Sequence, residues 1–129
     1  MRRLVVLLVV ATLLVPALAA SADSGDGQEA CNYGEICLSD LGTNERWRKH
    51  FWYNANYNGY QWWDATDDHY EGAVRDDTSG VRNRDSVCDV RLTNDAIIDQ
   101  DYTVANDGQL HSLVGVFDNK ADWHTRVNC

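Results

Sequence analysis

The stretch that most constrains the fold is an aromatic corner between Trp52 and Gly59, in the most aromatic part of the chain. Tyr57 follows Trp52 after four intervening residues, and Gly59 stands two positions beyond it. Glycine accepts a positive φ, so the backbone can fold back under the two rings at this point. Forty residues later the spacing recurs in weaker form, with Leu92 in place of Trp52 and Asp99 in place of Gly59. This echo predicts a chain built from two similar halves.

The N-terminus has the features of an export signal. A basic start is followed by an apolar run over 4–15 and by overlapping small-residue cleavage sites over 17–22. The apolar run is shorter than the ~20 residues that cross a bilayer. We therefore predict a signal peptide over 1–22, a disordered polar leader over 23–30 and one domain over 31–129. The protein is expected to be secreted and extracellular.

The charge balance limits the partners. The chain has 11 basic and 20 acidic residues and a formal net charge of −9. Such a surface repels nucleic acid and anionic membranes, so neither is expected to bind. The same charge keeps a secreted protein soluble, and we expect a monomer.

All four cysteines lie in the predicted domain, and an even number in a small secreted chain is typical of disulfides. The sequence contains no C-x-x-C pair, which is the spacing that would indicate a zinc site. Four cysteines allow three pairings. Of these we predict Cys31–Cys37, which closes a small N-terminal loop, and Cys88–Cys129, which ties the second half to the C-terminus.

The hydrophobic pattern favours strands. Apolar and polar residues alternate over 87–92, as in a half-buried strand. Three further segments have a strand-like composition: 61–63, 102–105 and 110–117. One segment departs from this pattern, because Trp47 and Phe51 are spaced i, i+4 and indicate a short helix within 44–52. We predict an all-β sandwich.

The echo extends beyond the aromatic corner. Gly72-Ala73-Val74 matches Gly115-Val116-Phe117 at a spacing of 43, and Asp76 matches Asn119. A three-residue loop insertion would change the spacing from 40 to 43. The two halves are about 31–86 and 87–129. Either half would expose an apolar face to water if it folded alone. We therefore predict two Greek-key motifs packed face to face in one cooperative unit.

These features resemble a known family. The aromatic corner resembles the signature of βγ-crystallin Greek-key motifs. The Cys31-x5-Cys37 pair, the run over 76–84 and the run over 118–129 resemble, in that order, secreted peptidase inhibitors of the same fold, typified by actinobacterial metalloproteinase inhibitors. The resemblance covers essentially the whole predicted domain. It implies a βγ-crystallin-like fold and inhibition of a secreted protease.

The resemblance also implies a calcium site. The family surrounds the ion with oxygen atoms from two Asn/Asp residues, two arbitrary residues and two Ser/Thr residues. The two matching segments here are 75–80 and 118–123, but Arg75 places a positive charge at a ligand position and Gly80 lacks a hydroxyl. The candidate ligands are Asp76, Ser79, Asp118, Asn119 and Asp122. The alternative is a pair of turns held by side chain–backbone hydrogen bonds. Apart from calcium, no cofactor is expected.

No motif indicates an enzyme. The four histidines are scattered, and neither a nucleophile elbow nor a glycine-rich phosphate loop is present. Acidic residues are so abundant that no catalytic pair stands out. We predict that the chain is not an enzyme, and a small secreted hydrolase is the alternative in that class.

Aromatic residues are concentrated between 47 and 70, where most should fill the core of the first half. Neighbours on a strand face opposite sides, so Trp62 and Trp63 cannot both point inward. Exposed rings suit a protein interface or a sugar.

The segment 39–50 contains the predicted contact surface. Cys37 lies 15 residues before Trp52, whereas Cys88 lies 4 before Leu92, so the first half carries about eleven extra residues. Inserted segments on rigid scaffolds often serve recognition. The predicted partner-binding residues are Arg46, Trp47, Arg48 and Lys49. The alternative is a solvated helical turn whose cations pair with nearby acids.

The function that follows is inhibition of a secreted protease by a loop docked into its cleft. The alternative is a calcium- or glycan-binding module of the same fold without inhibitory action.

Overall fold

The computed structural model describes residue 27 and residues 30–40, 45–96 and 100–129. The predicted signal peptide and most of the predicted leader lie outside these residues. Within them the fold is all-β, with one 3-10 turn, η1 (Gly115–Phe117), and no α-helix. The described part of the chain therefore contains no helix with the length and apolar character needed to cross a bilayer.

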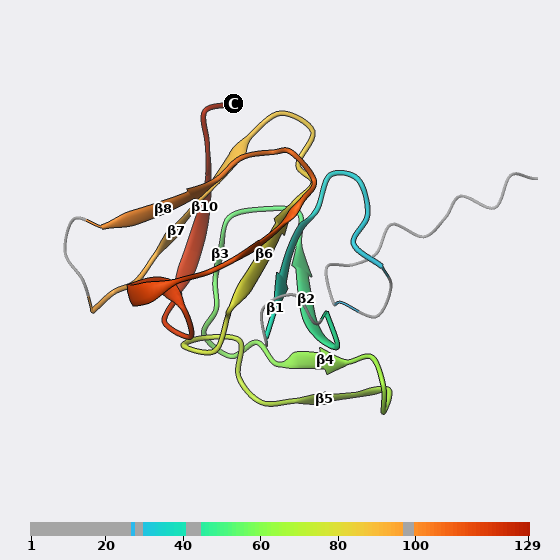
Figure 1. Cartoon of the computed structure of the whole chain (residues 1–129). Coiled ribbons are helices and arrows are strands. Elements are labelled where there is room, and N and C mark those ends of the chain that lie inside the picture. Colours follow the sequence, from blue (N-terminus) through green and yellow to red (C-terminus); the bar gives the residue numbers. More distant parts are fainter. Residues whose placement is uncertain (1–26, 28–29, 41–44, 97–99) are drawn as a thin grey trace, which may run out of the picture.

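Two antiparallel sheets make up the fold (Figure 1). In chain order the strands are β1 (Ile36–Ser39), β2 (Trp47–Phe51), β3 (Ala55–Asn56), β4 (Trp62–Asp64), β5 (His69–Glu71), β6 (Gly80–Asn83), β7 (Asp89–Thr93), β8 (Asp101–Val104), β9 (Leu110–Ser112) and β10 (Trp123–Val127). The larger sheet has the order β5-β4-β2-β1-β6-β9, and the smaller has the order β3-β10-β7-β8. The predicted all-β architecture is confirmed.

The core is one apolar cluster to which both sheets contribute. In β7 alternate residues, Val90 and Leu92, are fully buried. In β1 all four residues are buried, and Ile36 and Leu38 join the cluster. The remaining members are Phe51, Ala55, Tyr57, Trp62, Val74, Val81, Val104, Leu113, Phe117 and Ala121. Burying each large apolar side chain contributes roughly 1.5–3 kcal/mol, so this shared cluster holds the two sheets together.

The two sheets follow the same plan. Without the β4–β5 hairpin, the order β2-β1-β6-β9 corresponds to β8-β7-β10-β3. Apart from that hairpin, each sheet takes three strands from one half of the chain and its last strand from the other half. The residue pairing agrees, because Ser39 of β1 pairs with Gly80 of β6 just as Thr93 of β7 pairs with Trp123 of β10.

The segments that lead into β6 and β10 repeat the same backbone contacts. The amide of Asp76 donates to the carbonyl of Ala121 (3.3 Å), and the amide of Asn119 donates to the carbonyl of Thr78 (3.0 Å). Asp76 and Asn119 also share a positive φ, 60° and 54°. The echo at a spacing of 43 is therefore confirmed as a repeat of structure.

The weaker echo at a spacing of 40 is wrong in its register. Trp52 follows β2, whereas Leu92 lies inside β7. Leu38 of β1 is the residue that corresponds to Leu92 of β7. Leu38 pairs with Val81, and Leu92 pairs with His124, which lies 43 positions after Val81. Spacing alone misaligned the halves because an insertion separates the true matches.

The extra residues of the first half form the β4–β5 hairpin, not the segment 39–50. The connections β1–β2 and β7–β8 differ by one residue when counted between paired positions. Tyr57 and Leu113 correspond, because their amides donate to the carbonyls of Asp122 and Ser79, which are 43 residues apart. By contrast, 16 residues separate Tyr57 from Val74, and 3 separate Leu113 from Phe117. Figure 1 shows the added hairpin extending the larger sheet beyond β2.

Two predictions of local structure need correction, and a third is confirmed. The short helix expected within 44–52 is wrong, since this segment contains β2. Trp47 and Phe51 are an even number of residues apart, which places them on one face of a strand as well as of a helix. The strand expected over 110–117 ends at Ser112, before η1. Trp62 is 1% exposed and Trp63 is partly exposed, so this pair does face opposite sides.

Both predicted disulfides are present. Cys31–Cys37 joins the start of the domain to β1, and Cys88–Cys129 joins the residue before β7 to the C-terminal residue. The second bridge closes the much longer loop, with a sequence separation of 41 against 6. It therefore ties both ends of the second half together.

Candidate functional site

A buried aspartate anchors the inserted hairpin to β2. Asp64, at the end of β4, accepts hydrogen bonds from Arg46 Nη2 (2.6 Å), Trp47 Nε1 (2.8 Å) and the Thr66 amide (2.7 Å). The Arg46 guanidinium, with help from Trp47 and Thr66, holds the pKa of Asp64 far below its ordinary value. The carboxylate therefore stays ionised, and it fixes the base of the hairpin.

The tip of the hairpin is exposed. Every residue over 65–70 is exposed, and Tyr70 is 42% exposed. The rings of Trp63 and Tyr70 meet edge to face, with centroids 5.0 Å apart. Lys49 Nζ lies 5.8 Å from the centre of the Tyr70 ring and 5.3 Å from that of Tyr60. The hairpin is thus held at its base and along its length while its tip faces solvent.

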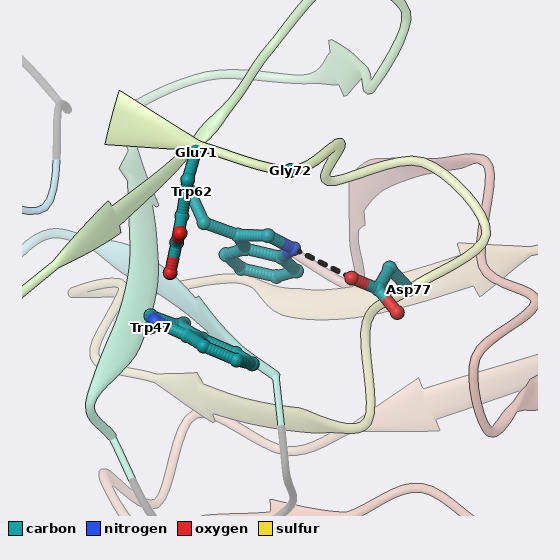
Figure 2. Close-up of a pocket in the computed structure, with 5 residues that line it drawn as sticks. All are labelled: Trp47, Trp62, Glu71, Gly72 and Asp77. Atoms are coloured by element: carbon teal, nitrogen blue, oxygen red, sulfur yellow. Dashed lines mark hydrogen bonds between the residues drawn. The ribbon is translucent and has the colours of Figure 1, made fainter. Parts of the chain in front are cut away.

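A cavity of about 250 Å³ opens where the hairpin meets β2 (Figure 2). Its lining residues are Trp47, Trp62, Glu71, Gly72 and Asp77. The indole of Trp62 lies above that of Trp47, with Glu71 at one side and Asp77 at the other. Trp62 Nε1 donates to Asp77 Oδ2 (3.1 Å).

Gly72 has two reasons to be a glycine at the wall of this cavity. Its φ of 60° is a conformation that residues with a Cβ adopt at a cost. A Cβ here would also lie 3.3 Å from Cδ1 of Trp62. The glycine therefore lets the chain turn tightly beside the indole.

The structure separates the four predicted partner-binding residues. Trp47 lines the cavity, and Arg46 beside it binds Asp64. Lys49 is only 8% exposed. Arg48 Nε donates to the carbonyl of Gly27 (2.6 Å), a buried residue of the predicted leader. Arg46 precedes β2 and the other three residues belong to it. All four make internal contacts, and their role in binding a partner stays a prediction.

At the predicted calcium site of the first half, a guanidinium lies among the acceptors. Arg75 donates from Nε to Asp122 Oδ1 (2.5 Å), from Nη1 to Asn58 Oδ1 (2.6 Å) and from Nη2 to Asp95 Oδ2 (3.2 Å). The other oxygen of Asp122 accepts from the Asp95 amide (2.6 Å). Asp122, which is 2% exposed, thus uses both oxygens within the protein.

The remaining candidate calcium ligands are spread out. Asp76, Asp118 and Asn119 are exposed, whereas Ser79 is buried. Among the residues that the structure describes, one group of three His, Cys, Asp or Glu side chains brings its ligand atoms within 4.8 Å of one another: Cys31, Glu35 and Cys37. The two cysteines of that group form a disulfide. The predicted acidic ligands therefore do not form such a cluster in the described structure.

Two of the four histidines are buried and paired. His124 Nε2 donates to the carbonyl of Tyr53 (2.8 Å), and its Nδ1 accepts from the hydroxyl of Tyr57 (3.0 Å). Burial lowers the pKa of His124 to about 4. His50 Nδ1 lies 3.3 Å from Glu35 Oε2. The other two histidines lie beside carboxylates, the exposed His69 near Glu71 and the partly exposed His111 near Asp107.

Sequence reasoning missed most of the cavity. Trp62, Glu71, Gly72 and Asp77 come from β4, β5 and the following loop, and none was predicted as a site residue. The adjacent Trp62 and Trp63 signalled only that one ring would leave the core, and that ring is Trp63, whereas the buried Trp62 lines the cavity. No protein-family model, curated protein or solved structure matches this chain.

Proposed function

We propose that the chain is a secreted peptidase inhibitor that presents the β4–β5 hairpin to the cleft of a protease. The supporting observation is the contrast between the exposed tip over 65–68 and its fixed base. The base is held by the ion pair between Arg46 and Asp64, and the strands by the contact between Trp63 and Tyr70. A loop that is ordered before docking loses little conformational entropy when it binds.

The proposed fold is a pair of βγ-crystallin-like Greek-key motifs. The first motif consists of β1, β2, β3 and β6, and the second of β7, β8, β9 and β10. Each motif gives its third strand to the sheet of the other motif. The segments that carry the family resemblance, 76–84 and 118–129, include the repeated turns and the strands β6 and β10.

The residues predicted from sequence take a supporting part in this proposal. Arg46 and Trp47 both donate to Asp64, so they set the direction of the hairpin. Lys49 lies over Tyr70 on β5 and steadies the outer strand. The contact with the protease is then made by the tip and not by the cations themselves.

A protease panel with two matched variants tests this function. The purified chain without its first 22 residues is incubated with secreted metallo-, serine and cysteine proteases. Ala65→Arg adds a large side chain at the exposed tip, and Ala105→Arg adds the same side chain at an exposed position after β8. We expect A65R to weaken inhibition at least about tenfold, a loss of ~1.4 kcal/mol, and A105R to leave it unchanged.

Two outcomes would count against the proposal. If no protease is inhibited by the unmodified chain, the function is wrong. If inhibition occurs but A65R inhibits as well as the unmodified chain, the hairpin does not make the contact.

Calcium binding before β10 is the second candidate function. At a spacing of 43, Asp118 corresponds to Arg75 and Ser79 corresponds to Asp122. The segment that leads into β10 thus has a carboxylate where the segment that leads into β6 has a guanidinium. Calorimetric titration should show binding in the range of extracellular modules, ~10⁻⁴–10⁻³ M, and Asp118→Asn should abolish it. Binding tighter than about micromolar would favour calcium sensing over inhibition.

A further inference from the structure

The cavity between Trp47 and Trp62 has an unusual distribution of hydrogen-bonding groups. Both indole N–H groups are already used, Trp62 Nε1 by Asp77 (3.1 Å) and Trp47 Nε1 by Asp64 (2.8 Å). The polar lining side chains are Glu71 and Asp77, and carboxylates only accept hydrogen bonds. The lining side chains therefore offer aromatic faces and acceptors to a ligand, but no donors.

This combination selects a cation. Indole faces attract ammonium and guanidinium groups, and carboxylates accept their hydrogen bonds. An anion would meet only repulsion from Glu71 and Asp77. A sugar needs acceptors for its hydroxyl hydrogens and also donors for its oxygens, and the lining side chains supply only the first.

The chain already holds two of its own cations against aromatic rings in this way. Arg46 Cζ lies 5.3 Å from the centre of the Trp47 ring, and Lys49 Nζ lies 5.3 Å from that of Tyr60. Arg46 is committed to Asp64 and to Asp67 (3.2 Å). It is not one of the residues that line the cavity.

Charge and size agree with a single basic side chain. The chain has a formal net charge of −9, which draws cationic partners towards it. Glu71 is paired only weakly, since His69 Nε2 lies 3.3 Å from its Oε2 and both side chains are more than a third exposed. A volume of about 250 Å³ is below the ~300–1,000 Å³ of pockets for drug-sized ligands.

We propose that this cavity binds an arginine side chain of a partner protein. The planar guanidinium stacks on the partly exposed indole of Trp47, beside the nearly covered Trp62, and donates to Glu71 and Asp77. Arginine is preferred to lysine because a planar group can stack on aromatic faces and bind a carboxylate with two parallel hydrogen bonds. This binding site goes beyond the proposed function, since it does not depend on the partner being a protease.

The test uses a short blocked peptide, acetyl-Gly-Arg-Gly-amide, and the purified chain. Binding is followed by NMR through the assigned indole N–H signals of Trp47 and Trp62. The matched ligand is the same peptide with citrulline, which keeps the shape of arginine and lacks its charge. We expect the arginine peptide to shift both signals saturably and the citrulline peptide to leave them in place.

Two protein variants separate the cavity from the general charge. Glu71→Gln removes one negative charge at the cavity, and Asp101→Asn removes one from an exposed position on β8. We expect E71Q to weaken the arginine peptide about fivefold or more and D101N to change it less than about twofold.

The proposal is overturned if citrulline binds as well as arginine, or if E71Q and D101N weaken binding equally. It is also overturned if the arginine peptide shifts other tryptophans only, or if simple sugars shift Trp47 and Trp62 and arginine does not. Equal binding of a lysine peptide would overturn the assignment to arginine. None of these outcomes depends on protease inhibition.

Discussion

The two crossing segments, before β6 and before β10, have the same backbone course and opposite charge. In the first, Arg75 reaches Asn58, Asp95 and Asp122, which come from three other parts of the chain. In the second, Asp118 stands at the corresponding position and is exposed. One turn geometry is therefore compatible with two different electrostatic solutions. A signature for the turn predicts the backbone without predicting what the turn binds.

The two halves also differ in where they contain inserted residues. The first half gained the β4–β5 hairpin, and the second goes directly from β9 to η1. The hairpin pairs with β2 at the end of the larger sheet. An addition at an edge leaves the central strands in place, so the hairpin adds new surface and contributes Trp62 to the shared core.

The largest expected contrast is between the two disulfides. In the chain-entropy description, opening the long loop by Cys88→Ser with Cys129→Ser costs about 4 kcal/mol, and opening the short loop by Cys31→Ser with Cys37→Ser costs about 2 kcal/mol. Urea unfolding of both double variants measures the difference. Equal losses would show that the second bridge does not hold the second half together by loop closure.

The next contrast concerns pH. His124 lies in β10 where Val81 lies in β6, and burial lowers the pKa of His124 to about 4. The neutral form is favoured in the folded state, so its contribution is fully present above the unfolded pKa, ~6.5, and is lost as the pH falls to about 4. The free energy of unfolding therefore falls by about 3 kcal/mol over this pH range. Subtracting the profile of His124→Gln from that of the unmodified chain should leave this step, and identical profiles would contradict it.

The charge difference between the crossings gives the third prediction. Arg75→Met leaves the buried carboxylate of Asp122 without its cation, and we expect the free energy of unfolding to fall by about 2 kcal/mol. Asp118→Asn, at the corresponding exposed position, should change it by less than about 0.5 kcal/mol. Thermal unfolding at neutral pH compares the two. A similar effect of both variants would mean that Arg75 is not a structural bridge.

The smallest contrast is between two matched glycines. Gly72 and Gly115 both have a positive φ, 60° and 63°. A Cβ at Gly72 would lie 3.3 Å from Trp62, whereas a Cβ at Gly115 would have no neighbour within 4 Å. Alanine at either position should cost about 1 kcal/mol for the backbone, and Gly72→Ala should cost somewhat more. If Gly115→Ala is the more costly, the two turns are not equivalent.

The accuracy of the sequence predictions follows the range of the interactions involved. The alternation over 87–92 and the repeated turn near Asp76 and Asn119 are local, and both are confirmed. The identity of β2 depends on its pairing with β1 and β4, so the spacing of Trp47 and Phe51 could not separate strand from helix. The cavity joins residues from β2, β4, β5 and a loop. No short sequence pattern predicts that these residues lie next to one another.

The exchange of third strands has a consequence for the evolutionary origin of such a chain. A single copy of either motif would have one sheet with an open edge and one strand with no sheet to join. The simplest remedy is a second identical copy, with each copy lending its loose strand to the other, as in domain-swapped homodimers. Tandem joining of the genes for two such copies would give this architecture in one molecule, and afterwards each copy would be free to diverge only where the other does not depend on it.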